Sequence, residues 1–357
     1  MTNQANRFLQ LHLLTSYPPA NLNRDDLGRP KTAKMGGVDR LRVSSQSLKR
    51  TWRTSELFQN ALHGHVGVRS KMLGVNVYQQ LLAGGIADKK AKTWAQAIAG
   101  QFGKLKKEDA NNPFNDLEIE QLVHVSQAEQ TVIDSLVKTL IAEQRAPEEN
   151  ELTILRASEM AADIALFGRM LASKPAFNVE AACQVAHAIS VHGVVIEDDY
   201  FTAVDDLNDH SEDAGAAHIG ETGFAAGLFY SYICINKELL VENLNGDKAL
   251  ADKAIQALTE AAVKVAPAGK QNSFGSRAYA SYVRAELGNQ QPRSLSVAFL
   301  KPLGKNADDY AAESIAALEL QAANFDKVYG DCSDVFYKLN AITAEGSMSE
   351  LLEFVTQ

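Results

Sequence analysis

The beginning of the chain carries the pattern that most restricts its fold, because a strand period gives way to a helix period within 57 residues. Over residues 7–15, leucines alternate with polar residues, which is the two-residue period of a β-strand with one buried face. Pro18 and Pro19 are expected to end this strand. Residues 45–57 then have the spacing of a helix. We therefore expect a strand that leads through a long loop into a helix.

The loop and the helix together form a basic segment. Residues 24–53 hold nine basic and three acidic side chains, a local charge of +6 in a chain of net charge −9, so the remainder carries −15. Such polarisation favours one localised site for a polyanion over a surface that is basic throughout. A run of solvated surface charges is the alternative. Glycines and prolines in the loop favour a binding site, because they let the backbone approach a ligand closely.

The helix is expected to have a packed side and a charged side. On a helical wheel, Leu48 and Trp52 share one side. The opposite side presents three cations: Lys49, Arg50 and Arg53. Ser44 or Ser45 is expected to cap the start of the helix, and the free amides of its first turn suit a phosphate.

Four stretches carry a resemblance to a known family. They are NLNRDD at 21–26, followed by GG and by RVSSQSLKR at 42–50; DIALFGRM at 163–170; QVAHAISVH at 184–192; and DYFTAVDDL at 199–207. The chain thereby resembles CasC, the backbone subunit of the type I-E CRISPR complex Cascade, within the RAMP superfamily. The likeness is specific over residues 7–55 and 160–236, and elsewhere the fold is inferred from patterning.

The resemblance implies an α+β fold, with an RRM-like (ferredoxin-like) palm, a large helical insertion and a protruding thumb hairpin or loop. Five parts are expected: the first part of the palm with the basic loop (1–57), a helical insertion called the fingers (58–160), palm (161–196), the thumb excursion (197–227), and palm with C-terminal helices (228–357). Strands are expected at 163–170, 184–196 and 228–235, from Tyr279, and at 295–300, and helices at 117–144, 247–265 and from Asp308. No strand is expected in 58–160.

The resemblance also implies a function. A subunit of this kind binds the guide RNA (crRNA), polymerises along it and presents it for pairing with target DNA, without catalysis. The residues expected to bind RNA are Asn23, Arg24, Lys31, Arg42, Ser45, Gln46, Lys49, Arg50, Arg53, Arg169, Met170, Tyr200, Phe201, Thr202, His218, Lys270 and Gln271. The expected partners are the guide RNA, target DNA through the guide, other copies of this chain, the other Cascade subunits and a separate helicase-nuclease.

Several of these residues have a structural alternative. By resemblance, Arg169 and Met170 lie beside the guide, but a methionine at the end of an apolar run is often a core residue. His218, Lys270 and Gln271 are equally compatible with purely structural roles. A basic cluster in the helical insertion, Lys104, Lys106 and Lys107, could hold target DNA, although a solvated face is the simpler interpretation.

The thumb excursion combines an aromatic pair with an acidic loop. In the family this excursion inserts between nucleotides, and Tyr200 and Phe201 suit stacking on bases of any identity, unless they only pack within a hairpin. Residues 197–227 hold nine acidic residues and no Lys or Arg, so they cannot clamp phosphate alone. We hypothesise that this loop docks near the basic segment of the next copy. Charge reversal at Asp205 and Asp206 would then weaken assembly.

The sequence lacks the common signatures of an enzyme. It contains no P-loop, no dinucleotide fingerprint, no nucleophile elbow and no HExxH motif, and its eight histidines and three cysteines are not spaced as metal ligands. We expect no cofactor and no metal. The distant cysteines fit a reducing, cytoplasmic location. We expect neither a signal peptide nor contact with a membrane, because the sequence has no apolar run of about 18 residues.

Two other functions stay open. In the related type III complexes, backbone subunits cut RNA with an aspartate in the loop after the first strand. Asp25 and Asp26 occupy that loop here, and two carboxylates could hold Mg²⁺ beside a phosphodiester in a metal-dependent ribonuclease. The other alternative is a protein-only assembly subunit whose basic loop meets acidic partners.

Overall fold

The structure is a computed structural model that describes residues 6–155, 160–204, 216–304 and 307–357, without the side chains of 203–219. The chain divides into two compact units. Unit 1 comprises Met1–Phe58, Val185–Cys234 and Gln256–Gln357, and unit 2 comprises Gln59–Gln184 and Ile235–Ile255. Three separate stretches of sequence therefore build unit 1.

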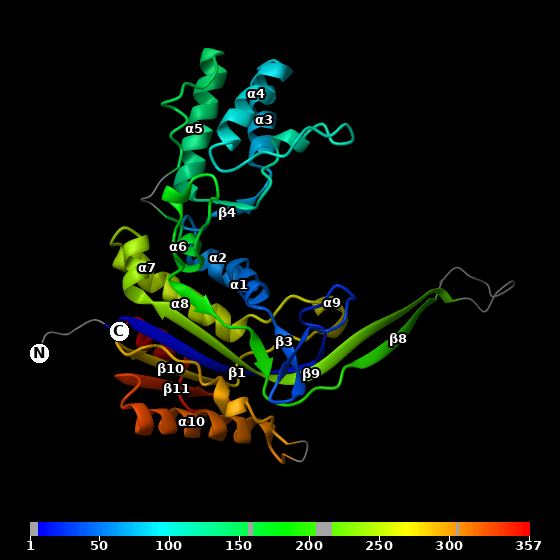
Figure 1. Cartoon of the computed structure of the whole chain (residues 1–357), viewed down its shortest axis with the longest axis vertical. Helices are drawn as coiled ribbons and strands as arrows, with labels where there is room; N and C mark the ends of the chain where they lie inside the picture. Colours follow the sequence, from blue (N-terminus) through cyan, green and yellow to red (C-terminus); the bar gives the residue numbers. More distant parts are fainter. Residues whose placement is uncertain (1–5, 156–159, 205–215, 305–306) are drawn as a thin grey trace, which may run out of the picture. The chain divides into compact units, whose positions relative to one another are not determined.

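Unit 1 is built on a sheet whose strands run in the order β11-β10-β1-β9-β7-β3-β2 (Figure 1). The strands are β1 (Phe8–Ala20), β2 (Thr32–Met35), β3 (Val38–Val43), β7 (Ala188–Ser190), β9 (Ala216–Asn236), β10 (Tyr282–Gly288) and β11 (Val335–Asn340). β8 (Glu197–Val204) pairs only with β9, so these two strands extend from the sheet as a ribbon. The strand β6 (Cys183–Val185) lies at the boundary of the units.

The first strand is longer than its prolines predict. β1 pairs antiparallel with β10 from Phe8↔Gly288 to Leu14↔Tyr282, and Leu9 and Leu11 are fully buried. It continues through Pro18 and Pro19 to Ala20, so the prediction that the prolines end the strand is wrong. Because the β10 pairing ends at Leu14, a proline nitrogen after that point costs no hydrogen bond on the β10 side.

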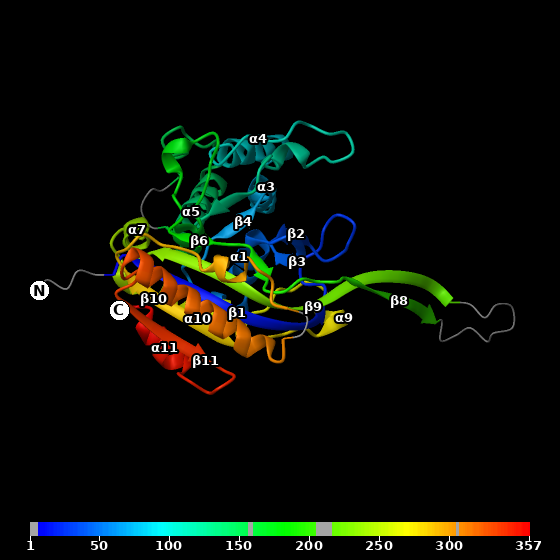
Figure 2. The same cartoon turned by 60° about the horizontal axis from the view of Figure 1, so that its bottom comes forward.

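The helices of unit 1 cover this sheet. They are α1 (Ser45–Arg53), α2 (Glu56–Ala61, whose end crosses into unit 2), α8 (Lys248–Lys264, which begins in unit 2), α9 (Gln271–Phe274), α10 (Tyr310–Tyr329) and α11 (Met348–Phe354), with the 3-10 helix η3 (Ser296–Phe299). α10 lies across one face of the sheet (Figure 2). Its Leu318 and Ala322 pack in one cluster with Leu14, Tyr230 and Tyr282 of the strands.

Unit 2 is mainly helical and has its own core. Its elements are β4 (Val68–Ser70), α3 (Leu73–Ala83), α4 (Asp88–Ala99), η1 (Asn115–Leu117), β5 (Val123–Val125), α5 (Gln127–Glu143), α6 (Ala162–Phe167), η2 (Pro175–Phe177) and α7 (Lys237–Asn243). Leu81, Trp94, Ile98 and Leu136 from α3, α4 and α5 belong to one buried cluster. Ser126 caps α5 in a reciprocal capping box with Glu129.

Four predictions about elements differ from the structure. The helix expected at 117–144 begins only at Gln127, because residues 123–125 form β5 and Ser126 caps the helix. Residues 163–170 were expected to form a strand, but Ala162–Phe167 form α6, in which five consecutive residues are buried and neither period is visible in the sequence. The run at 295–300 contains η3 in place of a strand, because Leu295 and Phe299 are buried at helical spacing. The insertion 58–160 does contain strands, since β4 and β5 pair antiparallel from Val68↔Val125 to Ser70↔Val123.

Other predictions agree with the structure. The fold is α+β, as expected, and the expected helix at 247–265 is α8. The RRM-like detail of the palm and the five-part division stay predictions. Within the described ranges, no helix has both the length and the apolar character needed to cross a bilayer.

Candidate nucleic-acid interface

Helix α1 has the packed side and the charged side that the sequence predicts. Leu48 and Trp52 are buried, Arg50 is exposed, and Lys49 and Arg53 are partly exposed. The cap is Ser44: its hydroxyl accepts a hydrogen bond from the backbone N–H of Ser47 at 3.3 Å, and its own N–H donates to Asn23 Oδ1 at 2.9 Å. The cap therefore joins the helix to the loop after β1.

The loop after β1 is held by hydrogen bonds from within and from β9. Oδ1 of Asp25 accepts from the backbone N–H groups of Leu27 and Arg29, each at 2.9 Å. The side-chain amide of buried Asn21 donates to the carbonyls of Gly28 and Gly223, also at 2.9 Å. Asp25 thus fixes the turn, and Asn21 anchors the turn to the base of the β8–β9 ribbon.

A cleft of about 1120 Å³ separates the basic segment from the stretch after α8. Arg24 and Arg50 line one wall, and Lys264, Arg277 and Tyr279 line the other. The expected RNA contacts Asn23 and Gln271 also line it, as do the carboxylates of Asp25 and Glu56. Four cations against two carboxylates leave this cleft with a net positive charge in an acidic chain.

The floor of this cleft requires a glycine. A Cβ at Gly269 would lie 2.2 Å from the carbonyl oxygen of Leu22 and 2.7 Å from that of Asn21. The stretch after α8 therefore lies directly against the end of β1. This approach brings Arg277, which is far away in the sequence, into the same cleft as Arg24.

A second cleft, of about 550 Å³, adjoins the first at Arg24. It is lined by Arg24, Arg29 and Lys270, with Asp198 and Glu221 from the ribbon. Arg29 forms an ion pair with Asp198 at 2.9 Å, and Lys270 Nζ lies 3.2 Å from Thr222 Oγ1. Acidic residues at the base of the ribbon thus meet the basic loop of the same chain, whereas the sequence-based hypothesis placed this pairing between copies.

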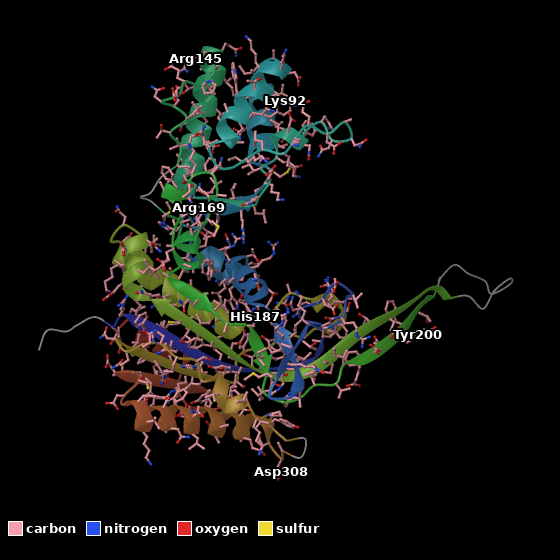
Figure 3. The ribbon with its side chains drawn as sticks, in the orientation of Figure 1. Lys92, Arg145, Arg169, His187, Tyr200 and Asp308 are labelled. Atoms are coloured by element: carbon pink, nitrogen blue, oxygen red, sulfur yellow. The ribbon has the colours of Figure 1, made fainter. Side chains whose placement is uncertain are left out.

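The aromatic pair of the thumb excursion lies on the β8–β9 ribbon. Tyr200, labelled in Figure 3, pairs with Glu221, and Phe201 pairs with Gly220. The two side chains are 65% and 42% exposed. Neighbouring strand residues project from opposite faces, so one base cannot stack on both rings. The ring of Phe201 lies over Gly220, where a Cβ would come within 2.3 Å of it.

The other residues of the thumb prediction are Thr202, His218, Asp205 and Asp206. Thr202 is exposed on the same strand. His218 pairs with Ala203 through its backbone, but its side chain lies outside the described residues, as do Asp205 and Asp206.

His187 also belongs to this surface, although the spacing of the histidines in the sequence indicates no role for it. The backbone N–H of Ser45 donates to its Nδ1 at 3.2 Å, and Arg42 Nη1 lies 3.4 Å from the same atom (Figure 3). Because the amide can only donate, Nδ1 is the acceptor and Nε2 carries the proton. Burial, followed by the charges of Arg42 and Lys31, lowers the pKa of His187. Gln46 is exposed beside Ser45.

Arg40 and Arg169 are engaged in the interior. Arg40 is fully buried and donates to the carbonyls of Ser190 and Phe299, both at 2.8 Å, which joins β3 to β7 and η3. In unit 2, the Arg169 side chain is 1% exposed and pairs with Glu129 at 2.8 Å (Figure 3). The expected contact of Arg169 with phosphate is thus disfavoured. Its neighbour Met170 is 79% exposed, so Met170 is not a core residue.

Two of the three lysines proposed for target DNA have acidic partners. Lys104 pairs with Glu120 at 2.8 Å, and Lys106 pairs with Glu118 at 2.5 Å. Lys107 is exposed. Within the described part of the chain, no group of three or more His, Cys, Asp or Glu side chains has the arrangement of a metal site.

Sequence reasoning missed Lys264, Arg277 and Tyr279. Their only signal is their position, just before and after the glycine-containing loop that holds Lys270 and Gln271. Nothing local shows that this loop packs against Leu22, so the second wall of the cleft becomes visible only in the folded chain.

Comparisons with known proteins found relatives that span the chain. The solved chain of a "CRISPR RNA-guided surveillance complex, pre-nicking" is 27% identical, with a TM-score of 0.82 over 98% of this chain and 99% of that chain. A chain of a "CRISPR RNA-guided surveillance complex" is 24% identical, with a TM-score of 0.74 over the same shares, and shows a common fold. A comparison with curated proteins gave no match.

The model of one protein family, described as CT1975-like protein, matches residues 9–353. Together with the solved structures, this match confirms the resemblance to a Cascade backbone subunit that the four sequence stretches indicate. Because the family model extends over nearly the whole chain, this protein belongs to the family of CT1975-like proteins.

Proposed function

We propose that this chain is a backbone subunit of a CRISPR surveillance complex. It binds the sugar–phosphate backbone of the guide RNA and presents the guide to target DNA. The observation that carries the proposal is the net positive cleft between Arg24 and Arg50 on one wall and Arg277 on the other. Its support is the similarity to a chain of an RNA-guided surveillance complex over almost all of both chains. In such complexes base pairing carries the sequence information, so the protein needs only phosphate contacts and stacking surfaces.

We further propose that the subunit is not a nuclease. A catalytic aspartate needs carboxylate oxygens directed at a metal ion or at a phosphodiester. Oδ1 of Asp25 instead accepts two backbone hydrogen bonds that shape its own loop. This geometry supports a structural role for Asp25, in contrast to the ribonuclease alternative.

The proposal also names the partners of this chain in the assembly. We propose that copies of this chain polymerise along the guide with the other Cascade subunits, and that a separate helicase-nuclease degrades the target. The ion pair between Arg29 and Asp198 shows that the basic loop accepts an acidic partner, which is compatible with a similar contact between copies.

The test is the combined change Arg24→Ala and Arg50→Ala. Each lost charged contact to phosphate should weaken binding of single-stranded RNA about tenfold, which is ~1.4 kcal/mol. The plot of log affinity against log salt concentration should become less steep, by about 0.7 in slope for each lost contact. The matched control is Lys89→Ala with Lys90→Ala, two exposed cations on α4 of unit 2.

Binding is measured by titrating labelled RNA at several salt concentrations, and the small RNA that copurifies with each variant is sequenced. Equal losses for the cleft variant and the α4 control would mean that the cleft has no special role. Full RNA loading by the cleft variant would overturn the proposal and favour the protein-only assembly subunit.

A further inference from the structure

Tyr279 is an exposed aromatic residue on a well-anchored backbone. Its side chain is 67% exposed. The next residue, Ala280, is buried and its N–H donates to the carbonyl of Val263 at 2.8 Å; the N–H of Ser281 donates to the carbonyl of Leu14, also at 2.8 Å. The backbone beside Tyr279 is thus tied to the chain before the loop and to β1, while the ring itself remains largely in solvent.

The ring stands among cations on both sides of the larger cleft. Arg277, also exposed, lies two residues before it on the same wall, and Arg24 and Arg50 lie on the other wall. Lys264 is less available, because it pairs with Glu260 at 2.6 Å. With about 1120 Å³, the cleft is larger than the roughly 300–1,000 Å³ of pockets that hold small molecules. Its size and charge suit a segment of a polyanion better than a single small ligand.

An exposed tyrosine in a basic groove has a specific use in single-stranded nucleic-acid recognition. Cations follow the phosphates, and an aromatic ring between them takes the face of a base, which every base possesses. The backbone beside Tyr279 is already held in place and a tyrosine side chain has few rotatable bonds, so stacking costs little conformational entropy.

From these observations we infer that Tyr279 is the stacking platform for one base of a single-stranded RNA in the cleft, and that Arg277 holds a phosphate next to that base. The inference rests on the proposed function and deepens it. It gives the stretch after α8 a base-stacking residue of its own, in addition to the exposed Tyr200 of the thumb ribbon. The selectivity is for an unstacked, single-stranded base of any identity, because the faces of the bases in a duplex are covered by the neighbouring base pairs.

The variants that test it separate stacking from charge. Tyr279→Ala should weaken RNA binding about tenfold without changing the salt slope, because no cation is lost. Tyr279→Phe should bind as the native chain does. Arg277→Ala should reduce the salt slope by about 0.7. The matched control is Tyr329→Ala, which removes a tyrosine that is 77% exposed at the end of α10.

The measurements use the full-length chain with short oligo(U) and oligo(A) RNAs, and thermal unfolding confirms that each variant is folded. In a second experiment, Tyr279→Trp supplies a fluorophore at the site, in a background where both native tryptophans are replaced by phenylalanine. Stacking should quench this fluorescence with a normal RNA, and the quenching should be smaller when the RNA is an abasic oligomer of the same charge.

The outcomes distinguish this inference from the function on which it rests. If Tyr279→Ala binds RNA normally while Arg24→Ala with Arg50→Ala weakens binding, the stacking platform is refuted and the proposed function stands. If neither variant affects RNA binding, both fail. If Tyr279→Ala impairs only self-association, the ring meets protein, and the inference is likewise overturned.

Discussion

At the scale of single residues, some arginines of unit 1 face the larger cleft and others hold the fold together. Arg24, Arg50 and Arg277 are exposed in the cleft, whereas Arg40 is fully buried on backbone carbonyls. Arg284 is also buried, and it pairs with Glu286 at 2.6 Å beneath α10. Within residues 24–53, therefore, at least one of the nine cations contributes to packing and not to a surface for RNA.

The buried histidine beside this pair makes stability depend on pH. The hydroxyl of Tyr230 accepts a hydrogen bond from the N–H of Leu295 and shares another with Nδ1 of His12 at 2.9 Å. Burial lowers the pKa of His12, and this outweighs the opposite effect of Glu286. Arg284 and Arg293 pair with the Glu286 carboxylate, and their positive charges lower the pKa of His12 further.

We expect the protonation of His12 in the unfolded chain to lower the free energy of unfolding by about 1 kcal/mol when the pH falls from 7 to 5.5. Below its ordinary pKa of about 6.5, His12 takes up a proton in the unfolded chain but not in the folded one, so acid favours unfolding. Denaturant unfolding of the native chain and of His12→Gln at a series of pH values measures this. A pH dependence that His12→Gln leaves unchanged would assign the effect elsewhere, first to His187, whose pKa is also lowered.

Sequence alone predicts residues whose role depends on near neighbours. The buried pair Leu48 and Trp52 and the cap at Ser44 follow from spacing and local hydrogen bonding, and both agree with the structure. Arg40 and Arg169 could not be separated from cleft arginines, because their partners lie far away in the chain: Phe299 for Arg40 and Glu129 for Arg169.

At the scale of elements, the loop after β1 joins the sheet, α1 and the cleft. The carboxylate of Asp25 accepts the hydrogen bonds that close its turn, and Asn23 Oδ1 accepts one from the N–H of Ser44, the N-cap of α1. The sequence identified this loop from charge and glycine content, which are local properties. The strand predicted at 163–170 failed for the opposite reason: a short apolar run that is buried on all sides has no period that distinguishes a helix from a strand.

The role of Asp25 in this loop predicts different effects for two substitutions. Asp25→Asn keeps an oxygen for the two backbone N–H groups and should retain nearly native affinity for RNA. Asp25→Ala removes that acceptor, leaves both donors without it, and should cost about 1–2 kcal/mol of loop stability and weaken RNA binding severalfold. Labelled RNA is incubated with each variant and Mg²⁺, and binding and cleavage are both recorded.

Asp26→Ala is the matched control for RNA binding, because Asp26 is exposed in the same loop. Its cleavage is recorded as well, because the ribonuclease alternative uses both carboxylates. A magnesium-dependent cleavage that disappears equally in Asp25→Asn and Asp25→Ala would support the ribonuclease alternative.

At the scale of the whole molecule, the chain consists of two units with separate cores and one tryptophan in each. Trp52 is 3% exposed in unit 1, and Trp94 is 6% exposed in unit 2. The sequence predicted the helical character of 58–160 from its apolar spacing. It did not predict that residues 161–184 and 235–255 complete the same unit, because that depends on contacts between distant stretches.

The buried ion pair of unit 2 predicts a selective loss of stability. Arg169→Met leaves the Glu129 carboxylate buried without its cation and should destabilise unit 2 by about 3–5 kcal/mol. Trp52→Phe leaves Trp94 as the reporter of unit 2, and Trp94→Phe leaves Trp52 as the reporter of unit 1. The unfolding midpoint seen by Trp94 should fall, whereas that seen by Trp52 should stay.

Adding Glu129→Gln to Arg169→Met should recover part of the loss, because the uncompensated charge disappears. Equal shifts at both tryptophans would show that the two units unfold as one.

The pairing of β1 with β10 has a consequence for biosynthesis. Phe8 finds its partner only at Gly288, and the two walls of the cleft are supplied by Arg24 and Arg277. In a nascent chain both edges of β1 therefore stay unpaired until β9 has been made, and the β10 edge stays open until Gly288. Such long-range pairing slows folding and exposes the strand to mispairing. All residues of unit 2 have been made once translation reaches Ile255, so unit 2 can fold before unit 1. The cleft can accordingly be completed only after translation has passed β10, so chains truncated before that point have no complete cleft.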